Sequence, residues 1–457
     1  MSEEKGYMRK LLALFAVTAF LVAACTPASP TTGASPAPQA TATEQATEAD
    51  ITLSGPVQVT LWHNQSGALA KGFEEMIKEF NSSNGKGITV KPEFQGNYTQ
   101  IYQKMLGAIQ AGTVPEGVVA VENQVADYAR AGIIVEMDPY INSKKNGLSP
   151  ESLKDIYQPY IDSNRYPQYG DRILSFPFIK SLEVMMVNED LLKELGYSAH
   201  PKTWAEFEEM SRKAKVVGAD GKVTRWGWAG MGSEAFLAGV LTRGGSILKS
   251  PTEVGFGGAD GLEMLQMYDR CIKEEFCYVP KGFDWQDRFG EGNLLFATGT
   301  STGRPFIKAA FKKPINWSLF GMPTNGTAPS RTIQFGGVIA ITRSTPEKQL
   351  AVWEFLKWFT DAKQTAKWSV LSSYMPVRAS ALEDAALKAH WAGPDVQGAQ
   401  AFALVPTSAA GPSIRGWQEV RDAIFEAITK VQTKKEAPDT SLATATRKAN
   451  DSLKENQ

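Results

Sequence analysis

The chain has 457 residues, a formal net charge of −1 and 43% hydrophobic residues. This balance has no basic excess, which excludes a protein that binds nucleic acid through phosphate contacts. About 400 residues follow position 55, and because a single core rarely grows that large, we expect two lobes.

The N-terminus has the pattern of a secretory signal. Three basic residues among the first ten precede an apolar run at 11–22, which is shorter than the roughly 20 residues that a membrane span needs. The sequence Val22-Ala23-Ala24-Cys25 resembles the bacterial lipobox. The resemblance implies a signal peptide over 1–24, cleavage before Cys25 and lipidation of Cys25. The alternative is an ordinary signal peptide with an incidental cysteine.

Residues 25–55 then read as a disordered tether. They are rich in Pro, Thr, Ala, Ser and Glu and poor in large apolar residues. Such a segment cannot bury enough surface to offset the entropy of ordering it. We therefore expect an extracytoplasmic protein that is anchored to the cell membrane through its lipid.

The first part of the folded body alternates between strand and helix patterns. The predicted elements are a strand at 57–62, a helix at 69–80, a strand at 88–94, a helix at 98–111 and a buried strand at 117–121. This order favours a parallel α/β sheet. Ligands of such sheets lie at the carboxyl ends of the strands, which points to residues 63–66, 96–98 and 122–124.

The alternation restarts after Gly170. Thr203 and Glu206 form a capping-box pattern at the start of a helix. Further predictions are strands at 184–188, 226–228 and 294–296, a buried β stretch at 332–342, and helices at 305–311, 347–359 and 417–431.

At this point the chain resembles the extracellular solute-binding proteins that feed ABC importers of sugars and related polyols. The motifs that carry the resemblance are Trp62-His63, Gly96-Asn97-Tyr98, Pro201-Lys202-Thr203-Trp204, Phe335-Gly336-Gly337 and Tyr374-Met375-Pro376-Val377, and their order and spacing are similar over most of 57–431.

The resemblance implies an α/β, two-lobed periplasmic-binding-protein fold with discontinuous domains joined by a hinge. Lobe 1 would take 56–175 plus 325–373, and lobe 2 would take 176–324 plus 374–457. The chain would cross between lobes near 175–180, 323–325 and 373–375, and the lobes would close on ligand by hinge bending.

The implied function is that of a substrate-binding lipoprotein of an ABC importer. It would capture a carbohydrate or a glycerol-3-phosphate-type polyol and deliver it to the transmembrane subunits of the permease, as a monomer and without catalysis. The alternative is a lipid-anchored extracellular carbohydrate-active enzyme. That alternative needs a carboxylate pair; Glu122, Glu183 and Glu291 are candidates, but no motif pairs them.

The glycerol-3-phosphate-binding members of the family supply expected ligand contacts. The resemblance assigns ligand contact to Tyr98, Glu122 and Ser181, to the region of Gly336 and Gly337, and to Tyr374. An ionised Glu122 accepts strong hydrogen bonds from vicinal hydroxyls. The structural alternatives are a helix cap for Tyr98, a loop salt bridge for Glu122 and a bulge or hinge at the two glycines.

The aromatic contact of the second lobe falls near positions 233–234, where this chain has no aromatic residue. Trp228, a few residues upstream, is therefore our candidate for it. Most of the eleven Trp of the chain are expected in the core.

Two arginines are candidates for phosphate. Ser301 and Arg304 lie in a hydroxyl-rich segment before a predicted helix, where backbone N–H groups favour anions. The phosphate-binding arginine of the resembling proteins falls at about Ser413, two residues from Arg415. A capped helix with a solvated Arg304 and a surface salt bridge for Arg415 are the alternatives, and a neutral sugar competes with glycerol phosphate.

Cys271 and Cys277 are six residues apart, and a disulfide between them requires that the helix end between them. The three histidines are scattered, and no Cys/His cluster has zinc-ligand spacing. We therefore expect no metal and no cofactor.

Overall fold

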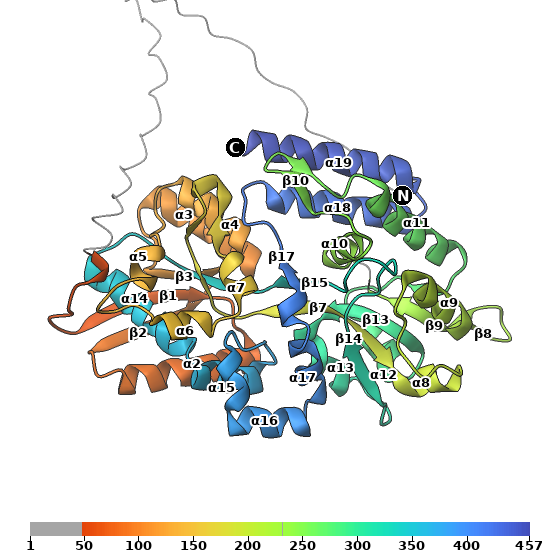
Figure 1. Ribbon diagram of the computed structural model, residues 1–457, viewed down its shortest axis with the longest axis horizontal. Coiled ribbons are helices and arrows are strands. Elements are labelled where there is room, and N and C mark those ends of the chain that lie inside the picture. The colour runs from red at the N-terminus through yellow and green to blue at the C-terminus, as the bar shows by residue number, and fades with distance from the viewer. Residues whose placement is uncertain (1–47, 231) are drawn as a thin grey trace, which may run out of the picture. The chain divides into compact units, whose positions relative to one another are not determined.

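The structure is a computed structural model that describes residues 48–457 except Met231. The expected signal peptide, Cys25 and the tether as far as residue 47 lie outside the described residues. The described chain builds two main β-sheets, each covered by helices (Figure 1). None of the helices in the described part is long and apolar enough to cross a membrane.

The first sheet has the strand order β2-β1-β3-β16-β6. Strand β1 is parallel to β2 and β3, whereas β16 is antiparallel to β3 and β6. The mixed sheet thus keeps the predicted parallel strands, and it adds one antiparallel strand, β16, and a strand parallel to β3, β6. The bounds are β1 Val57–His63, β2 Ile88–Phe94, β3 Gly117–Ala120, β6 Phe176–Pro177 and β16 Val338–Ile341.

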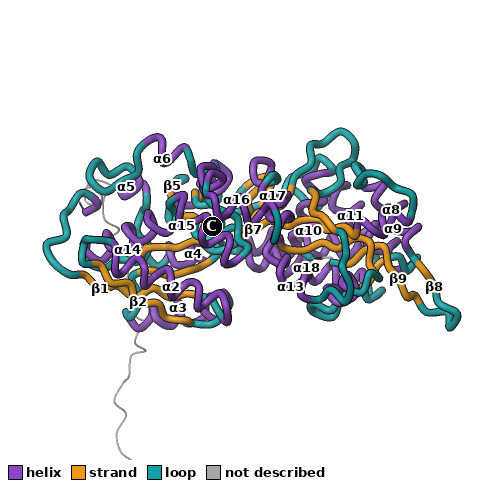
Figure 2. The backbone as a smooth tube through the Cα atoms, turned by 90° about the horizontal axis from the view of Figure 1, so that it is seen from below, coloured by secondary structure: helices purple, strands orange, loops and turns teal. Residues whose placement is uncertain are grey.

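The helices of this half follow from local sequence signals. Helix α2 (Gly67–Ser83) buries Phe73, Met76, Ile77 and Phe80, the spacing that predicted it. Helix α3 (Tyr98–Ala111) begins with a capping box between Asn97 and Gln100 and ends at Gly112 in the left-handed region. Helix α14 (Pro346–Phe359) packs beside β1 (Figure 2).

The second sheet has the order β12-β9-β13-β7-β15-β17, and β14 and β8 pair with β7 and β9. All eight residues of β7 are buried, which places this strand at the centre of the half. The bounds are β7 Ser181–Asn188, β8 Val216–Val217, β9 Val223–Ala229, β12 Cys277–Tyr278, β13 Leu294–Thr300, β14 Trp317–Phe320, β15 Thr332–Phe335 and β17 Ser408–Ala410.

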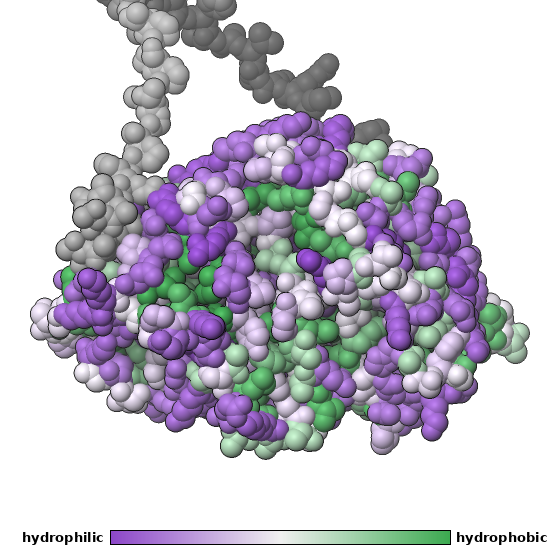
Figure 3. Space-filling view, in the orientation of Figure 1, coloured by the Kyte–Doolittle hydropathy of each residue, from purple (hydrophilic) through white to green (hydrophobic). Residues whose placement is uncertain are grey.

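Five long helices cover this second sheet: α9 (Trp204–Ala214), α10 (Ser233–Thr242), α11 (Ala259–Lys273), α18 (Trp417–Gln432) and α19 (Pro438–Glu455). Helices α18 and α19 pack along each other. The outer side of α19 carries hydrophilic residues in the space-filling view (Figure 3). The sequence analysis did not predict α19.

The chain crosses between the sheets at neighbouring places. It leaves the first sheet after β6 and enters the second at Ser181, and the backbone N–H of Met375 donates to the carbonyl of Lys180 beside that crossing. The expected β stretch at 332–342 is two strands, because β15 pairs with β7 and β16 pairs with β3. The prediction of a crossing at 323–325 is therefore wrong, because the chain passes from the second sheet to the first at Gly336-Gly337.

Only glycine fits this crossing. Gly336 has φ of 138°, and a Cβ there would stand 2.2 Å from the carbonyl oxygen of Ile179. A side chain would separate the two crossing segments.

The expected tether does not extend to residue 55. Ala49 is fully buried, and the side-chain amide of Asn146 donates to the carbonyl oxygens of Ala49 and Ile51 at 2.8 and 2.9 Å. Ile51 and Leu53 pack against the hydrophobic core of the half that contains β1 and α2. These apolar side chains anchor residues 49–53 on the first half, although the composition around them is that of a linker.

Cys271 and Cys277 form a disulfide, with their Cα atoms 5.4 Å apart. Helix α11 ends at Lys273, and Glu275 takes a positive φ of 56°. The helix thus ends between the cysteines, as their pairing requires.

Candidate ligand-binding cleft

A cavity of about 410 Å³ lies between the two halves and is lined by residues of both. Five of the predicted ligand residues line it: Tyr98, Glu122, Ser181, Gly336 and Tyr374. Glu122 follows β3 directly, so the position at a strand's carboxyl end is as expected. The structure thus brings together residues that are up to 276 positions apart in the sequence.

Tyr98 lines the cleft, and its hydroxyl is buried against Gly337. Its Oη makes no hydrogen bond to any described residue, although the Asn64 side chain lies close enough to offset part of the effect of burial on its pKa. Burial, with a smaller contribution from Tyr374, raises the pKa of Tyr98 well above its ordinary value, so the hydroxyl stays protonated. A buried hydroxyl without a partner is costly, and a polar ligand would satisfy it.

Gly337 sits against this hydroxyl. A Cβ at Gly337 would stand 2.8 Å from Tyr98 Oη and 3.0 Å from Ile179 Cγ1. The glycine therefore keeps the space that the Tyr98 side chain occupies.

Glu122 is not free. Its Oε1 lies 2.6 Å from Nζ of Lys180, whose side chain is fully buried, and the same Nζ donates to Ser163 Oγ at 3.2 Å. The salt bridge that was the structural alternative for Glu122 is present, and its partner was not anticipated. Lys180 interrupts the apolar run at 176–187. A lysine in such a run was the signal in the sequence for a buried charge that needs an acidic partner.

Ser181 and Tyr374 complete the predicted set in the cavity. Ser181 Oγ donates to the Phe335 carbonyl at 3.3 Å, which ties β7 to β15 beside the crossing. Burial raises the pKa of Tyr374 to about 12.

The second half contributes a charged pair that the sequence analysis missed. Arg421 of α18 donates to Glu234 Oε1 of α10 through Nη2 at 2.6 Å and Nε at 2.9 Å, and both residues line the cavity. Trp417 lines the same wall. Glu234 stands where the aromatic contact of the resembling proteins was expected, so here that position carries a carboxylate.

Trp228 does not take the place of that aromatic contact. Its side chain is 1% exposed, its Nε1 donates to Thr298 Oγ1 at 2.7 Å, and its ring packs on Phe207 and Tyr268. The prediction of ligand contact at Trp228 is therefore wrong, because β9 turns this ring into the core of the second half.

Arg304 and Ser301 are also structural. Arg304 is 2% exposed; its Nε and Nη2 each donate to the Asp395 carboxylate at 2.8 Å, and Nη2 also donates to the Ser373 carbonyl at 3.2 Å. Ser301 is fully buried and accepts from the Leu182 backbone N–H at 3.1 Å. Arg304 cannot clamp a phosphate without breaking its pair with Asp395.

Arg415 lies outside the cleft cavities of the described residues. Its backbone N–H donates to Gln168 Oε1 at 2.8 Å, and its Nε is buried without a hydrogen-bond partner in the described chain. The structure therefore does not bring the two candidate arginines together.

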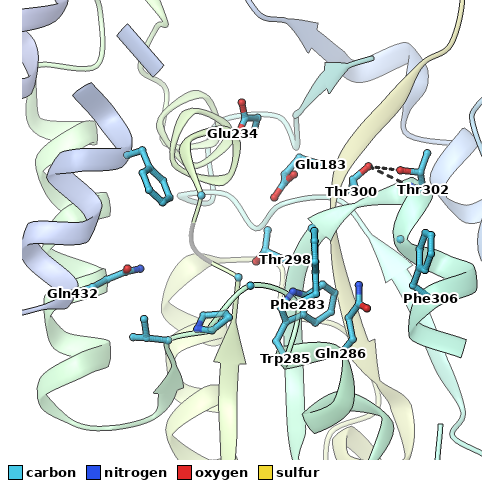
Figure 4. A pocket seen from close by; sticks show the side chains of 18 residues that line it. Glu183, Glu234, Phe283, Trp285, Gln286, Thr298, Thr300, Thr302, Phe306 and Gln432 are labelled. Atoms are coloured by element: carbon cyan, nitrogen blue, oxygen red, sulfur yellow. Dashed lines mark hydrogen bonds between the residues drawn. The ribbon is translucent and has the colours of Figure 1, made fainter. Parts of the chain in front are cut away.

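Two further cavities adjoin the first. One of about 630 Å³ shares Glu234, Thr300 and Thr302 with it (Figure 4), and one of about 710 Å³ shares Thr302 and Tyr374. The cleft is therefore a set of connected cavities around Thr302. No group of three or more His, Cys, Asp or Glu side chains in the described residues is arranged to hold a metal ion.

The Gly337→Ala variant is expected to weaken ligand binding by about tenfold, since the added Cβ displaces the Tyr98 hydroxyl and 1.4 kcal/mol is a factor of ten. Isothermal titration with the most stabilising ligand of the thermal-shift panel described below measures the effect. Gly107→Ala is the matched control, because nothing lies within 4 Å of a Cβ there. Equal affinities of the two variants would contradict the assignment.

Two halves with mixed α/β sheets, three chain crossings and a cavity shared between them define a two-lobed binding protein. A family model described as "Bacterial extracellular solute-binding protein" matches residues 75–395. The chain belongs to this family of solute-binding proteins.

Individual relatives agree with that placement. The sn-glycerol-3-phosphate-binding periplasmic protein UgpB of Salmonella paratyphi A is 22% identical over 411 residues, covering 87% of this chain and 92% of the relative. Among solved structures, the cyclic alpha-maltosyl-1,6-maltose binding protein of Arthrobacter globiformis has a TM-score of 0.75 at 19% identity, over 88% of this chain and all of that one. UgpB of Mycobacterium tuberculosis, in complex with glycerophosphocholine, has a TM-score of 0.74 at 19% identity, over 88% and 99% of the two chains.

Proposed function

We propose that this solute-binding protein captures a carbohydrate or related polyol in the cleft and delivers it to the transmembrane subunits of an ABC importer. One observation carries the proposal: the cavity that both lobes line is bordered by Tyr98, whose buried hydroxyl makes no hydrogen bond in the described chain, and by Glu122 and Glu234. Hydroxyl and carboxylate groups recognise vicinal hydroxyls through hydrogen bonds.

A neutral polyol fits these residues better than a phosphate. Arg304 and Arg421 are each paired with a carboxylate, and Lys180 is paired with Glu122. Glycerol 3-phosphate remains the second candidate, because the protein from Salmonella paratyphi A named above binds it. A phosphate would have to draw Arg421 away from Glu234.

The arrangement does not favour the enzyme that was the alternative. Glu122 is held by Lys180 in one cavity, Glu183 lines another, and Glu291 lines neither. A glycosidase needs two carboxylates facing one bond, whereas these three do not share a cavity. Glu234, which lines both cavities, is paired with Arg421. The family of the chain consists of binding proteins.

The proposal includes the location. Cys25 would carry the lipid that holds a monomeric protein outside the cytoplasm at the membrane. Mass spectrometry of the mature N-terminus tests this, since an unmodified N-terminus upstream of Cys25 would contradict it.

The test of the ligand is a thermal-shift panel of mono- and disaccharides, glycerol and glycerol 3-phosphate on the purified folded body. A ligand at 100 times its dissociation constant adds about 2.7 kcal/mol to the free energy of unfolding. Small-angle scattering with the best ligand should show a smaller radius of gyration as the lobes close. Substrate turnover, or no stabilisation by any polyol, would overturn the proposal.

A further inference from the structure

The cavity of about 630 Å³ next to the cleft has a lining of its own. It opens beside Glu234, Thr300 and Thr302, which it shares with the cleft, and continues into the second lobe between α12 (Trp285–Gly290), β13 and α18 (Figure 4). A ligand that sits in the cleft can therefore extend into it.

Three phenyl rings, which carry no hydrogen-bonding groups, and one indole line this cavity. Phe283, Phe306 and Phe425 are 74, 63 and 57% exposed, and Trp285 lines the same cavity. These are the three most exposed large hydrophobic side chains in the described chain. Exposed apolar side chains that gather at one cavity mark a binding site rather than ordinary surface.

A buried carboxylate points into the middle of this aromatic lining. Glu183 lies on β7, is 7% exposed, and makes no side-chain hydrogen bond to any described residue. Figure 4 shows its carboxylate directed into the cavity near Thr298. Burial, followed by repulsion from Glu234, raises the pKa of Glu183 to about 8. The Glu183 carboxyl group is therefore protonated near neutral pH.

The described lining includes no Lys, Arg or His side chain. In the described chain, the titratable groups whose charges interact with that of Glu183 are Glu234, which lines the cavity, and the buried Tyr268. Arg421 brings a positive charge to Glu234, but it is paired there and does not line this cavity. An anion would meet a carboxylate here without compensation.

The geometry points to an ammonium-binding subsite, in which the carboxylate of Glu183 and the ring of Phe283 beside it receive a primary or quaternary ammonium group of the ligand, in a cavity that Phe306 and Phe425 also line. This inference rests on the proposed function, because it assigns one end of the polyol that the cleft captures. Cations are attracted to the faces of aromatic rings, and the attraction grows when the cation is desolvated. The two chemical sources are an amino sugar and a choline-like polyol.

The experiment compares pairs of probes that differ in charge. Choline is titrated beside 3,3-dimethylbutan-1-ol, its uncharged isostere, and glucosamine beside glucose. At pH 7, where the amine of glucosamine is largely protonated, we expect the charged member of one pair to bind at least tenfold more tightly than its neutral partner, and the pair that does so identifies the source. Binding of the cation expels the Glu183 proton, so the affinity for choline, whose own charge does not change with pH, should fall as the pH is lowered from 8 to 6.

Glu183→Gln is the diagnostic variant. It keeps the shape of the side chain and cannot ionise, so it should fold, and it should abolish both the charge preference and the pH dependence. Glu253→Gln, in an exposed pair with Lys249, is the matched control and should change neither. Phe283→Ala should weaken the preferred cation at least threefold.

Equal binding of charged and neutral partners, or an unchanged preference in Glu183→Gln, would overturn the inference. Binding of neutral sugars with lobe closure in the same experiment would leave the proposed function intact. Failure of every polyol would instead remove the proposed function.

Discussion

Lys180→Met is expected to lower the free energy of unfolding by about 3–5 kcal/mol, because it leaves the Glu122 carboxylate, which is 14% exposed, without its buried partner. Denaturant unfolding followed by tryptophan fluorescence measures the loss. The double variant Lys180→Met/Glu122→Leu should recover a large part of it, because no unpaired charge remains.

The control for this pair is Lys367→Met. Lys367 pairs with Glu79 at 2.6 Å, but both side chains are exposed, at 45 and 38%. Its loss should cost no more than about 1 kcal/mol. Similar losses for Lys180→Met and Lys367→Met would show that the buried pair contributes nothing special.

Arg304→Met is the second large effect, with an expected loss of about 3–5 kcal/mol in the free energy of unfolding. The guanidinium holds Asp395 and the Ser373 carbonyl from a site that is 2% exposed. Arg304→Met/Asp395→Leu should recover stability, and the ligand affinity of this double variant should stay within about threefold of the wild type, which is under 1 kcal/mol.

Lys308→Met is the matched control on the same helix, α13 (Arg304–Ala309), since Lys308 is exposed and donates only to the Pro394 carbonyl at 3.0 Å. It should change stability by less than about 1 kcal/mol. A specific loss of phosphate binding in the stable double variant would return Arg304 to the role of an anion clamp.

The elements that the sequence predicted well are those with a strong local period. The helix expected at 69–80 is Gly67–Ser83, the helix expected at 347–359 is Pro346–Phe359, and the helix expected at 417–431 is Trp417–Gln432. Apolar residues at helical spacing form one buried face in α2 and α18, whereas α14 carries such residues and is buried on nearly all sides. Most of α19 instead lacks large apolar residues, and it is held by packing on α18.

The candidate site depends on contacts that local patterns do not encode. Arg304 and Asp395 are 91 residues apart, and Lys180 and Glu122 are 58 apart. A strand at 332–342 looks continuous, because residues that favour strands stand on both sides of Gly336-Gly337, although the two halves belong to different sheets. Resemblance placed Tyr98 and Glu122 in the cleft, but the chemical neighbours of Glu122 required the fold.

Residues 49–53 pack on the first lobe, so a lipid anchor at Cys25 would be linked to that lobe. From Cys25 to Ala49 the chain has 24 peptide steps, which span at most about 80 Å when fully extended. With the anchor proposed at Cys25, the link to the membrane would join the lobe of β1 and α2, on which residues 49–53 pack. The second lobe, with its aromatic cavity, would then have no link of its own, and the proposed lobe closure would move it relative to the anchored lobe.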